Sequence, residues 1–365
     1  MTTRMIVLAV FLIAARSAAP ALPGTATAGT DTLHAVPAPD ARDHANIERL
    51  ERVLADDSME GRGTATPGGE RAARFLAGEM QRIGLKRGGD SGFLQRVPMM
   101  VPAPAGSASE TGRGRGARLM TLPSLADLDT VPLDRRRHAE NVVGILPGGD
   151  PALSKEVVLV LSHYDHLGVR TPAIPGGDSI YNGADDDASG TVAVLEVARL
   201  LRRAGTPRRT IIFANMTGEE VGLLGTNFFI AHPPVPLTQI VAGFEIEMIG
   251  RPDSLAGGPG KAWLTGYERS TMGDMLKEYG IAIVPDMRPD QRFFTRSDNY
   301  GLARRGIVAH TLSSFNLHSD YHQVTDEVSK IDFDHMTAVI HSAAEAVRHL
   351  ADGPRPEWHP GGAPR

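Results

Sequence analysis

The sequence predicts an α/β fold, a three-layer sandwich in which helices cover both faces of a mostly parallel central sheet. Three observations support this prediction. From residue 141 onward, short apolar runs rich in β-branched residues alternate with segments whose apolar residues recur at helical spacing. The 365 residues, of which 41% are hydrophobic and 22% charged, are enough to bury a substantial core. Polar residues gather where the apolar runs end, which is where open α/β sheets bind their ligands.

The expected elements follow one another along the chain. Two helices are expected before the alternation begins, at 46–54 and 70–83, and Gly84 ends the second. The strands are expected at 142–146, 157–161, 210–215, 240–248, 281–284 and 307–312. The helices that connect and follow these strands are expected at 191–203, 223–231, 270–279 and 334–350.

The two ends of the chain differ from its middle. Residues 1–28 have the pattern of a signal peptide, a short apolar run followed by small residues. We expect 29–42 to be a flexible lead-in, 43–352 a single domain with a loop excursion at 100–137, and 353–365 a disordered tail. The protein is therefore expected to be exported to the periplasm or the extracellular space, with no stable membrane association after the signal is removed.

The composition excludes several classes of function. A net charge of −5 gives no basic face, so we expect no nucleic-acid partner. The absence of Cys excludes disulfides, thiolate metal ligands and a Cys nucleophile. Any metal ion must therefore be held by His and carboxylate side chains.

Several such side chains lie where predicted strands end or helices begin. They are His163, Asp186, Glu219, Glu220, Glu247 and His322. Taken singly, the acidic runs at 185–187 and 219–220 are typical of solvated turns. Glu247 differs, because a carboxylate between two apolar residues of a strand is costly to bury unless it is paired or binds a metal. The placement of all six at one edge of the sheet favours a metal site.

The donor types favour zinc. Imidazoles and carboxylates without thiolates are typical of catalytic zinc sites, and Mn²⁺ or Co²⁺ would suit the same donors. The charges favour two ions. Two Zn²⁺ ions would be neutralised by Asp186, Glu220, Glu247 and one bridging hydroxide, whereas one ion would leave excess negative charge.

Five motifs in this order, HYDHLG, GADDDASG, TGEEVGLLGT, IEMIG and DYHQVTDE, resemble those of the M28 family of zinc aminopeptidases. The resemblance covers roughly residues 45–350, and the segment that begins LADDSMEGRG is similar to the lead-in of secreted bacterial members. It implies a phosphorylase/hydrolase-like sandwich with a co-catalytic pair of zinc ions. The implied activity is that of an exported aminopeptidase, which removes N-terminal residues from peptides with a free N-terminus.

The resemblance also implies a set of metal ligands. His163 and Glu247 would hold one ion, Glu220 and His322 the other, and Asp186 would bridge both. Glu247 stands where many members of the family have Asp. Four other histidines match no ligand of the family and are expected to be structural or surface residues: His166, His310, His318 and His335.

Three further residues receive catalytic roles from the resemblance. Glu219 would be the general base that takes a proton from the metal-bound water and returns it to the leaving amine. Asp165 would orient the His163 ring by a hydrogen bond. Tyr321 matches a position that stabilises the oxyanion in some members.

Other functions stay open at this point. Related glutaminyl cyclases share most of these motifs and work with one zinc ion, and a hydrolase of non-peptide amides or a catalytically silent binding protein would share the fold. Metal content at full activity separates the first of these from a peptidase. The substrate pocket is expected to come from loops within 251–300, and the residues expected to line it are Arg292, Phe293, Phe294, Arg296 and Asp298, unless they form a mixed surface loop.

Overall fold

The computed structural model describes residues 35–103 and 119–364. The expected signal peptide, 1–28, and the first part of the lead-in lie outside the described residues. None of the helices in the described ranges is both long enough and apolar enough to cross a bilayer.

A ten-stranded mixed sheet runs through the described part of the chain, in the order β11-β10-β12-β9-β5-β8-β4-β2-β3, with β1 paired to β4. Its four central strands are parallel, namely β8 (Thr210–Met216), β5 (Val157–His163), β9 (Ile240–Ile246) and β12 (Ala309–Ser313). The flanking strands are β1 (Lys86–Arg87), β2 (Leu94–Met100), β3 (Met120–Thr121), β4 (Arg136–Leu146), β10 (Ala262–Leu264) and β11 (Ile283–Pro285). All flanking pairs are antiparallel except β10 with β11. The predicted α/β class with a parallel centre is confirmed.

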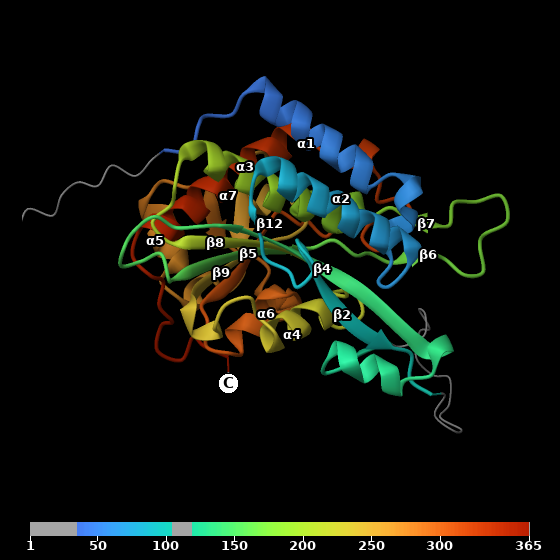
Figure 1. Ribbon diagram of the computed structural model, residues 1–365. Helices are drawn as coiled ribbons and strands as arrows, with labels where there is room; N and C mark the ends of the chain where they lie inside the picture. Colours follow the sequence, from blue (N-terminus) through green and yellow to red (C-terminus); the bar gives the residue numbers. More distant parts are fainter. Residues whose placement is uncertain (1–34, 104–118, 365) are drawn as a thin grey trace, which may run out of the picture. The chain divides into compact units, whose positions relative to one another are not determined.

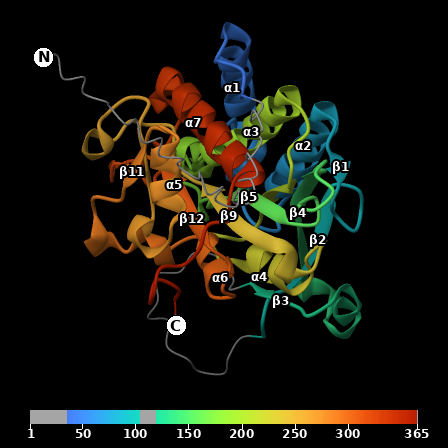
Figure 2. The same ribbon diagram turned by 90° about the vertical axis from the view of Figure 1, so that its left-hand side faces the viewer.

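Helices cover both faces of this sheet (Figures 1 and 2). One face carries α1 (Ala41–Leu54), α2 (Pro67–Ile83), α3 (Gly190–Ala204) and α7 (Phe333–Asp352). The opposite face carries α4 (Leu224–Ala231) and α6 (Asn299–Ala303), and α5 (Met272–Glu278) lies near the β11 edge. Local signals set several helix ends: Asp40 caps α1 through a capping box, and Gly84 ends α2 in the left-handed conformation.

The central strands are mostly apolar and almost fully buried because both of their faces are covered. In β5, Val158 and Val160 pack in the core under α1, α2, α3 and α7, while Leu159 and Leu161 pack in the core on the other face. All seven residues of β5 are buried. In such a sheet, ligands bind in the crevice outside the carboxyl ends of the strands, and this rule places the site described below.

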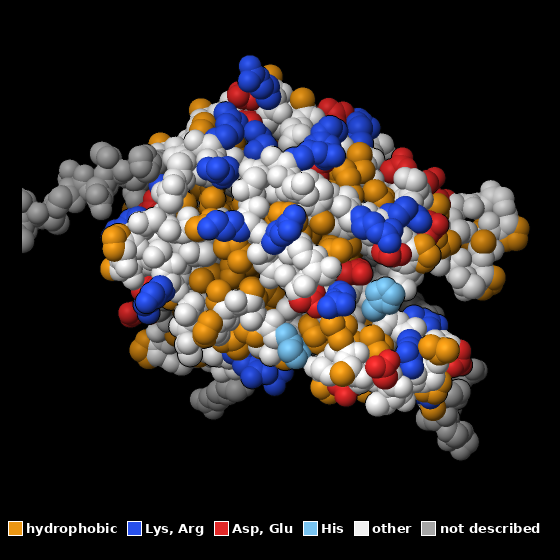
Figure 3. All heavy atoms as spheres, in the orientation of Figure 1, with side chains coloured by type: hydrophobic (Ala, Val, Ile, Leu, Met, Phe, Trp, Pro, Cys, Tyr) orange, Lys and Arg blue, Asp and Glu red, His pale blue; other side chains and the backbone are white. Residues whose placement is uncertain are grey.

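The outer face of the α1–α2 layer carries many arginines with acidic side chains between them (Figure 3). Arg49 pairs with Glu79 at 3.2 Å, and Arg203 pairs with Asp43 at 3.0 Å. Positive charge on this face is therefore largely compensated by neighbouring acids.

Several elements differ from the predictions. β4 begins at Arg136, six residues before the predicted start, and β2, β10 and α6 were not predicted. Within the predicted excursion at 100–137, residues 119–135 form β3 and two short 3₁₀ helices, while 104–118 lie outside the described residues. β10 and α6 have only three and five residues and carry little periodicity, and Pro98 interrupts the strand pattern of β2.

The C-terminal residues 353–364 are held against the domain, in contrast to the expected disordered tail. The main chain of Glu357 accepts a hydrogen bond from Thr271 at 2.9 Å, and His359 donates one to the Arg269 carbonyl at 2.9 Å. The indole of Trp358 donates to a main-chain carbonyl at 3.0 Å. Disorder was predicted from the Pro- and Gly-rich composition. Composition does not show that one aromatic residue, Trp358, holds the segment in place.

Candidate metal centre

The candidate metal centre forms where the parallel strands end. His163 is the last residue of β5, Glu219 and Glu220 follow β8 after a short turn, and Glu247 follows β9 directly. Asp186 lies in the irregular turn that leads into α3. Because β8, β5 and β9 are adjacent and parallel, their C-terminal ends bring these side chains to one edge of the sheet.

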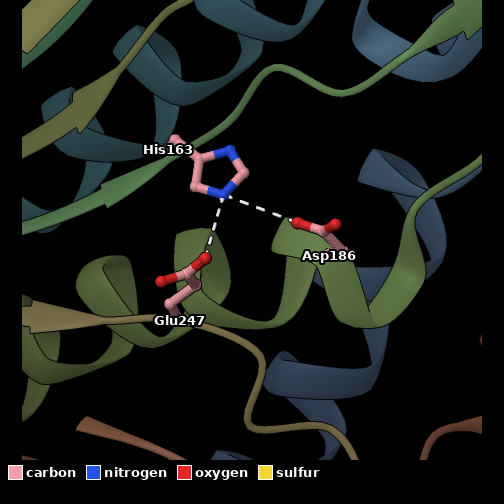
Figure 4. Close-up of side chains that lie close together, drawn as sticks. All are labelled: His163, Asp186 and Glu247. Carbon is pink, nitrogen blue, oxygen red and sulfur yellow. Dashed lines mark ion pairs between the residues drawn. The ribbon is translucent and has the colours of Figure 1, made fainter. Parts of the chain in front are cut away.

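The first group of donor atoms comprises His163, Asp186 and Glu247 (Figure 4). The Nε2 atom of His163 lies 3.5 Å from Oδ1 of Asp186 and 3.7 Å from Oε1 of Glu247. On the other side of the ring, Nδ1 of His163 lies 3.1 Å from the main-chain oxygen of Asp165. A ring that donates through Nδ1 keeps the Nε2 lone pair directed at the two carboxylates.

The second group shares Asp186 with the first. Its Oδ2 atom lies 3.0 Å from Nε2 of His322 and 3.8 Å from Nδ1 of His166. Oε1 of Glu220 lies 3.1 Å from Nε2 of His322 and 2.8 Å from Nδ1 of His166. One carboxylate thus faces both groups, as expected of a bridging ligand.

The donor atoms fit metal ions. Four donor atoms are buried and have no hydrogen-bond partner within residues 35–103 and 119–364, although each lies close to another polar atom: Nε2 of His163, Nδ1 of His166, Oδ2 of Asp186 and Oε1 of Glu220. Buried polar atoms without partners cost about 1–3 kcal/mol each, so their convergence calls for a ligand. Imidazole nitrogens and carboxylate oxygens are the donors that zinc accepts in catalytic sites.

Only the middle residue of the acidic run takes part. Asp185 accepts a hydrogen bond from the main-chain nitrogen of Gly250 at 2.7 Å, and Asp187 accepts one from that of Met248 at 3.0 Å. Both neighbours of Asp186 therefore hold the segment that follows β9 against the start of α3, which positions Asp186 between the two groups.

The prediction for the Asp165 carboxylate was wrong. Its Oδ1 lies 3.9 Å from Nδ1 of His163, and the ring is oriented by the Asp165 main-chain oxygen instead. The carboxylate is already occupied, because it accepts hydrogen bonds from the Thr64 hydroxyl at 2.7 Å and from the main-chain nitrogen of Glu219 at 3.1 Å. Asp165 thus links the β5 end to the segment that carries the predicted general base.

His166, which was predicted to be structural or on the surface, lies with its ring in the second group of candidate donors. The sequence signal was present, since His166 follows His163 by three residues just beyond β5, but it matched no family ligand. The remaining three unassigned histidines form hydrogen bonds within the fold, as expected of structural residues: His310, His318 and His335.

Glu219 and Tyr321 lie at the same pocket as the donor atoms. Desolvation raises the pKa of the Glu219 carboxyl well above its ordinary value, and nearby Glu247 acts in the same direction. The Tyr321 ring stacks on His322, with ring centroids 3.9 Å apart. Both residues therefore line the pocket beside the donor atoms, and their catalytic roles stay predictions.

The pocket next to the metal centre has aromatic walls. Trp263 stacks on Phe293 with centroids 5.0 Å apart, Phe293 meets Phe315 at 5.9 Å, and Phe315 meets Tyr321 at 5.0 Å. The pocket is also lined by Met248, Thr265, Arg296, Thr311 and Ser313. This arrangement gives an apolar recess beside a strongly acidic one.

Two of the residues predicted to line the pocket do so, Phe293 and Arg296. The prediction was wrong for three that do not line it, the exposed Arg292 and the buried Phe294 and Asp298. Phe294 instead packs against His310 and Trp358, with centroids 5.6 and 6.3 Å apart. Adjacent residues of a short 3₁₀ helix point in different directions, so only one of the two phenylalanines reaches the pocket.

Glu245 is a positioning residue that the sequence analysis missed. This fully buried carboxylate on β9 accepts hydrogen bonds from the hydroxyls of Ser297 and Thr311 and from the main-chain nitrogens of Asp298 and Asn299, at 2.7–3.1 Å. Burial raises the pKa of Glu245 to about 8. Its side chain fixes the pocket loop to the strand that ends next to Glu247. Its position inside an apolar strand was the available signal.

Comparisons with known proteins agree with this geometry. The sequence profile described as Peptidase family M28 matches residues 141–347. Leucine aminopeptidase 1 of Emericella nidulans is 26% identical over 200 residues, which are 51% of this chain and 50% of that protein. The chain thus spans about half the length of the curated relatives it matches.

Two solved structures illustrate the likeness of fold. BSAP, a zinc aminopeptidase from Bacillus subtilis, gives a TM-score of 0.60 at 14% identity and covers 85% of this chain and 95% of its own. A glutaminyl cyclase from Bacteroides thetaiotaomicron gives 0.57 at 16% identity and covers 86% and 99%. At such identities the likeness extends to the fold alone and does not separate a peptidase from a cyclase.

Proposed function

The chain belongs to peptidase family M28, and from this premise we propose that it is an exported di-zinc aminopeptidase. The observation that carries the proposal is the pair of donor groups that share Asp186, in which buried nitrogen and oxygen atoms converge without hydrogen-bond partners. The pocket beside these groups is open to a substrate. The aminopeptidase activities named for the similar proteins support the same proposal.

The ligands of the two ions would be divided as the resemblance implies. His163 and Glu247 would hold one ion, Glu220 and His322 the other, with Asp186 shared. When bound, the ions supply Lewis acidity and lower the pKa of a coordinated water toward neutrality. Mn²⁺ or Co²⁺ would be accepted by the same donors.

The side chains around the ions would move the protons. Glu219 lies in the pocket with its pKa raised, so it can hold a proton taken from the attacking water and pass it to the leaving amine. The Tyr321 hydroxyl would donate a hydrogen bond to the oxygen of the tetrahedral intermediate. The acidic side chains would attract the free α-amine of the substrate.

The aromatic walls support a preference for an apolar N-terminal residue. Trp263, Phe293 and Phe315 line the pocket, and apolar side chains gain most from contact with such a surface. The main alternative is a single-zinc enzyme similar to glutaminyl cyclases, or a hydrolase of other amides.

Metal analysis of the purified protein, combined with a panel of aminoacyl chromogenic substrates, tests the proposal. We expect two ions per chain at full activity, cleavage of substrates with a free α-amine but not of their N-acetylated forms, and loss of cleavage after chelation. One ion per chain with cyclisation of an N-terminal glutamine would establish the alternative. A metal-free protein that cleaves the panel would overturn both.

Export is proposed from the N-terminal pattern of the sequence. Expression of the full chain in a secreting host, followed by N-terminal sequencing of the released protein, tests it. A product that begins after Ala21 or Ala28 supports cleavage of a signal peptide, whereas an intact Met1 on cell-associated protein contradicts it.

A further inference from the structure

The two groups of donor atoms are unequal. The group at Glu247 has one imidazole, that of His163, together with two carboxylates. In the other group, the carboxylate pair of Asp186 and Glu220 faces two imidazoles, those of His322 and His166, at distances of 2.8–3.8 Å. The second imidazole of this group has no counterpart among the ligands implied by the family resemblance.

The His166 ring has no other polar partner. It is fully buried, and neither Nδ1 nor Nε2 makes a hydrogen bond in the part of the chain that the structure describes. Oε1 of Glu220 lies only 2.8 Å from Nδ1, yet neither atom has a hydrogen-bond partner among the described residues. Nδ1 of His166 and Oε1 of Glu220 are close together but not hydrogen-bonded to each other. This is the arrangement expected of two ligands of one metal ion.

The backbone around His166 makes room for this orientation. Gly183, at φ 55°, packs so closely that a Cβ atom there would lie 2.5 Å from Cδ2 and 2.6 Å from Cγ of the His166 ring. The carbonyl of Gly183 accepts a hydrogen bond from the buried Arg62 guanidinium at 2.8 Å. The main-chain nitrogen of His166 donates to the Arg62 carbonyl at 3.3 Å. The ring is thus held from both sides, and glycine is required opposite it.

We propose that Nδ1 of His166 is a further protein ligand of the ion at Glu220, so that this site has two imidazoles and two carboxylates. The inference rests on the proposed function, because it requires that two ions bind. Four protein donors close a zinc site, whereas three leave a position open to water or substrate. The Glu220 site therefore retains zinc tightly, and the Glu247 site exchanges its ion more readily and accepts Mn²⁺ more easily.

Stepwise loading of metal-free protein tests this asymmetry. We expect Zn²⁺ to bind in two classes of different affinity in the wild type. His166→Gln, which keeps a polar side chain of similar size, should weaken the tighter class by about 100-fold or more, since even loss of an outer partner of a ligand costs 10–100-fold. His335→Gln, which removes a buried imidazole elsewhere, is the matched control and should leave both classes unchanged.

The number of coordinated rings gives a second readout that does not depend on a variant. In the Co²⁺-loaded wild type, NMR should show three paramagnetically shifted ring N–H signals, from His163, His166 and His322, and His166→Gln should lack one. Two signals in the wild type, or unchanged affinities in a folded His166→Gln protein, would overturn the inference while leaving the di-zinc proposal intact. A wild type that binds fewer than two ions would instead overturn the proposed function.

Discussion

The metal centre and the network directly behind it are both built from buried charged side chains, yet they differ in one respect. In the network, defined here as Arg62, Asp185 and Asp326, every charged nitrogen or oxygen has a partner. Arg62 donates to four main-chain carbonyls at 2.6–2.8 Å, and Asp326 accepts from the main-chain nitrogens of Asp185 and Asp186. In the candidate metal centre, Oδ2 of Asp186, Nε2 of His163 and Nδ1 of His166 have no hydrogen-bond partner among the described residues.

This difference separates scaffold from site more clearly than burial does. Asp185 and Asp186 are adjacent in the chain and both almost fully buried. Asp185 is satisfied by a main-chain nitrogen and by His318, whereas Oδ2 of Asp186 has no hydrogen-bond partner among the described residues. Removing a residue of the scaffold should therefore change stability, and removing a residue of the site should change metal binding or catalysis at nearly constant stability.

The largest effect should come from the site. Glu219→Gln keeps the shape of the side chain but cannot accept the proton, so kcat should fall by about 10²–10⁴-fold. Metal content and thermal stability should stay at the wild-type level, because Glu219 is not among the proposed ligands. Steady-state kinetics and metal analysis check both. Glu140→Gln, a change at a buried carboxyl outside the pocket, is the control, and near-normal turnover of Glu219→Gln would rule out the general-base role.

The complementary test removes the centre of the scaffold. Arg62→Met leaves four buried carbonyls without donors, so the free energy of unfolding should fall by about 3–5 kcal/mol, as when a buried ionic partner is removed. Chemical denaturation in saturating zinc measures it. Arg71→Met, at an exposed ion pair with Glu60, should cost less than about 1 kcal/mol. Equal costs for the two variants would contradict the assignment of Arg62 to the scaffold.

The buried imidazole of His310, which lies outside the candidate metal centre, should make the free energy of unfolding depend on pH. Burial lowers the pKa of His310 to about 4, and the ring lies between the Ser270 hydroxyl and the Thr265 carbonyl, each at 2.7 Å. The unfolded chain binds this proton near pH 6.5, so the stabilisation is complete above pH 6.5 and is lost as the pH falls toward 4, by about 3 kcal/mol. Denaturation curves across this range measure the slope.

His310→Gln isolates this contribution, because other groups titrate in the same range. The variant should have a smaller decrease in stability between pH 6.5 and 4 than the wild type. Parallel pH profiles of the two proteins would mean that the buried ring does not titrate as the structure indicates.

The smallest effect should come from the C-terminal segment. Trp358→Ala removes ring contacts with Phe294 and His310 and the hydrogen bond to the Gly306 carbonyl, which together stabilise the fold by about 1–2 kcal/mol. Thermal denaturation should show the decrease, and Trp358→Phe should recover part of it. A tail that contributes nothing would leave both variants at the wild-type melting temperature.

Most of the fold could be predicted from the sequence because the central strands and the main helices show clear periodic patterns. The strand-end rule also brought together His163, Asp186, Glu220 and Glu247, since a parallel sheet places C-terminal strand ends side by side whatever the loops do. His166 was missed because its role depends on a ring orientation that Gly183, seventeen residues later, permits. Such a long-range fit leaves no periodic signal.

The pocket was the least predictable part. Phe293 and Phe294 are chemically equal neighbours, and only the local turn decides that the first faces the pocket and the second packs toward Trp358. Likewise, Glu245 acts through four hydrogen bonds to residues more than fifty positions away in the chain. Side-chain direction in irregular segments follows from tertiary packing, which composition and spacing do not encode.

The proposed ligands are drawn from segments that start at His163 and end at His322, so a growing chain holds no complete set until most of it has been made. A partly synthesised or extended precursor could bind stray ions only weakly. If the chain is exported as proposed, the complete set of ligands would therefore form only once the chain has folded at its destination.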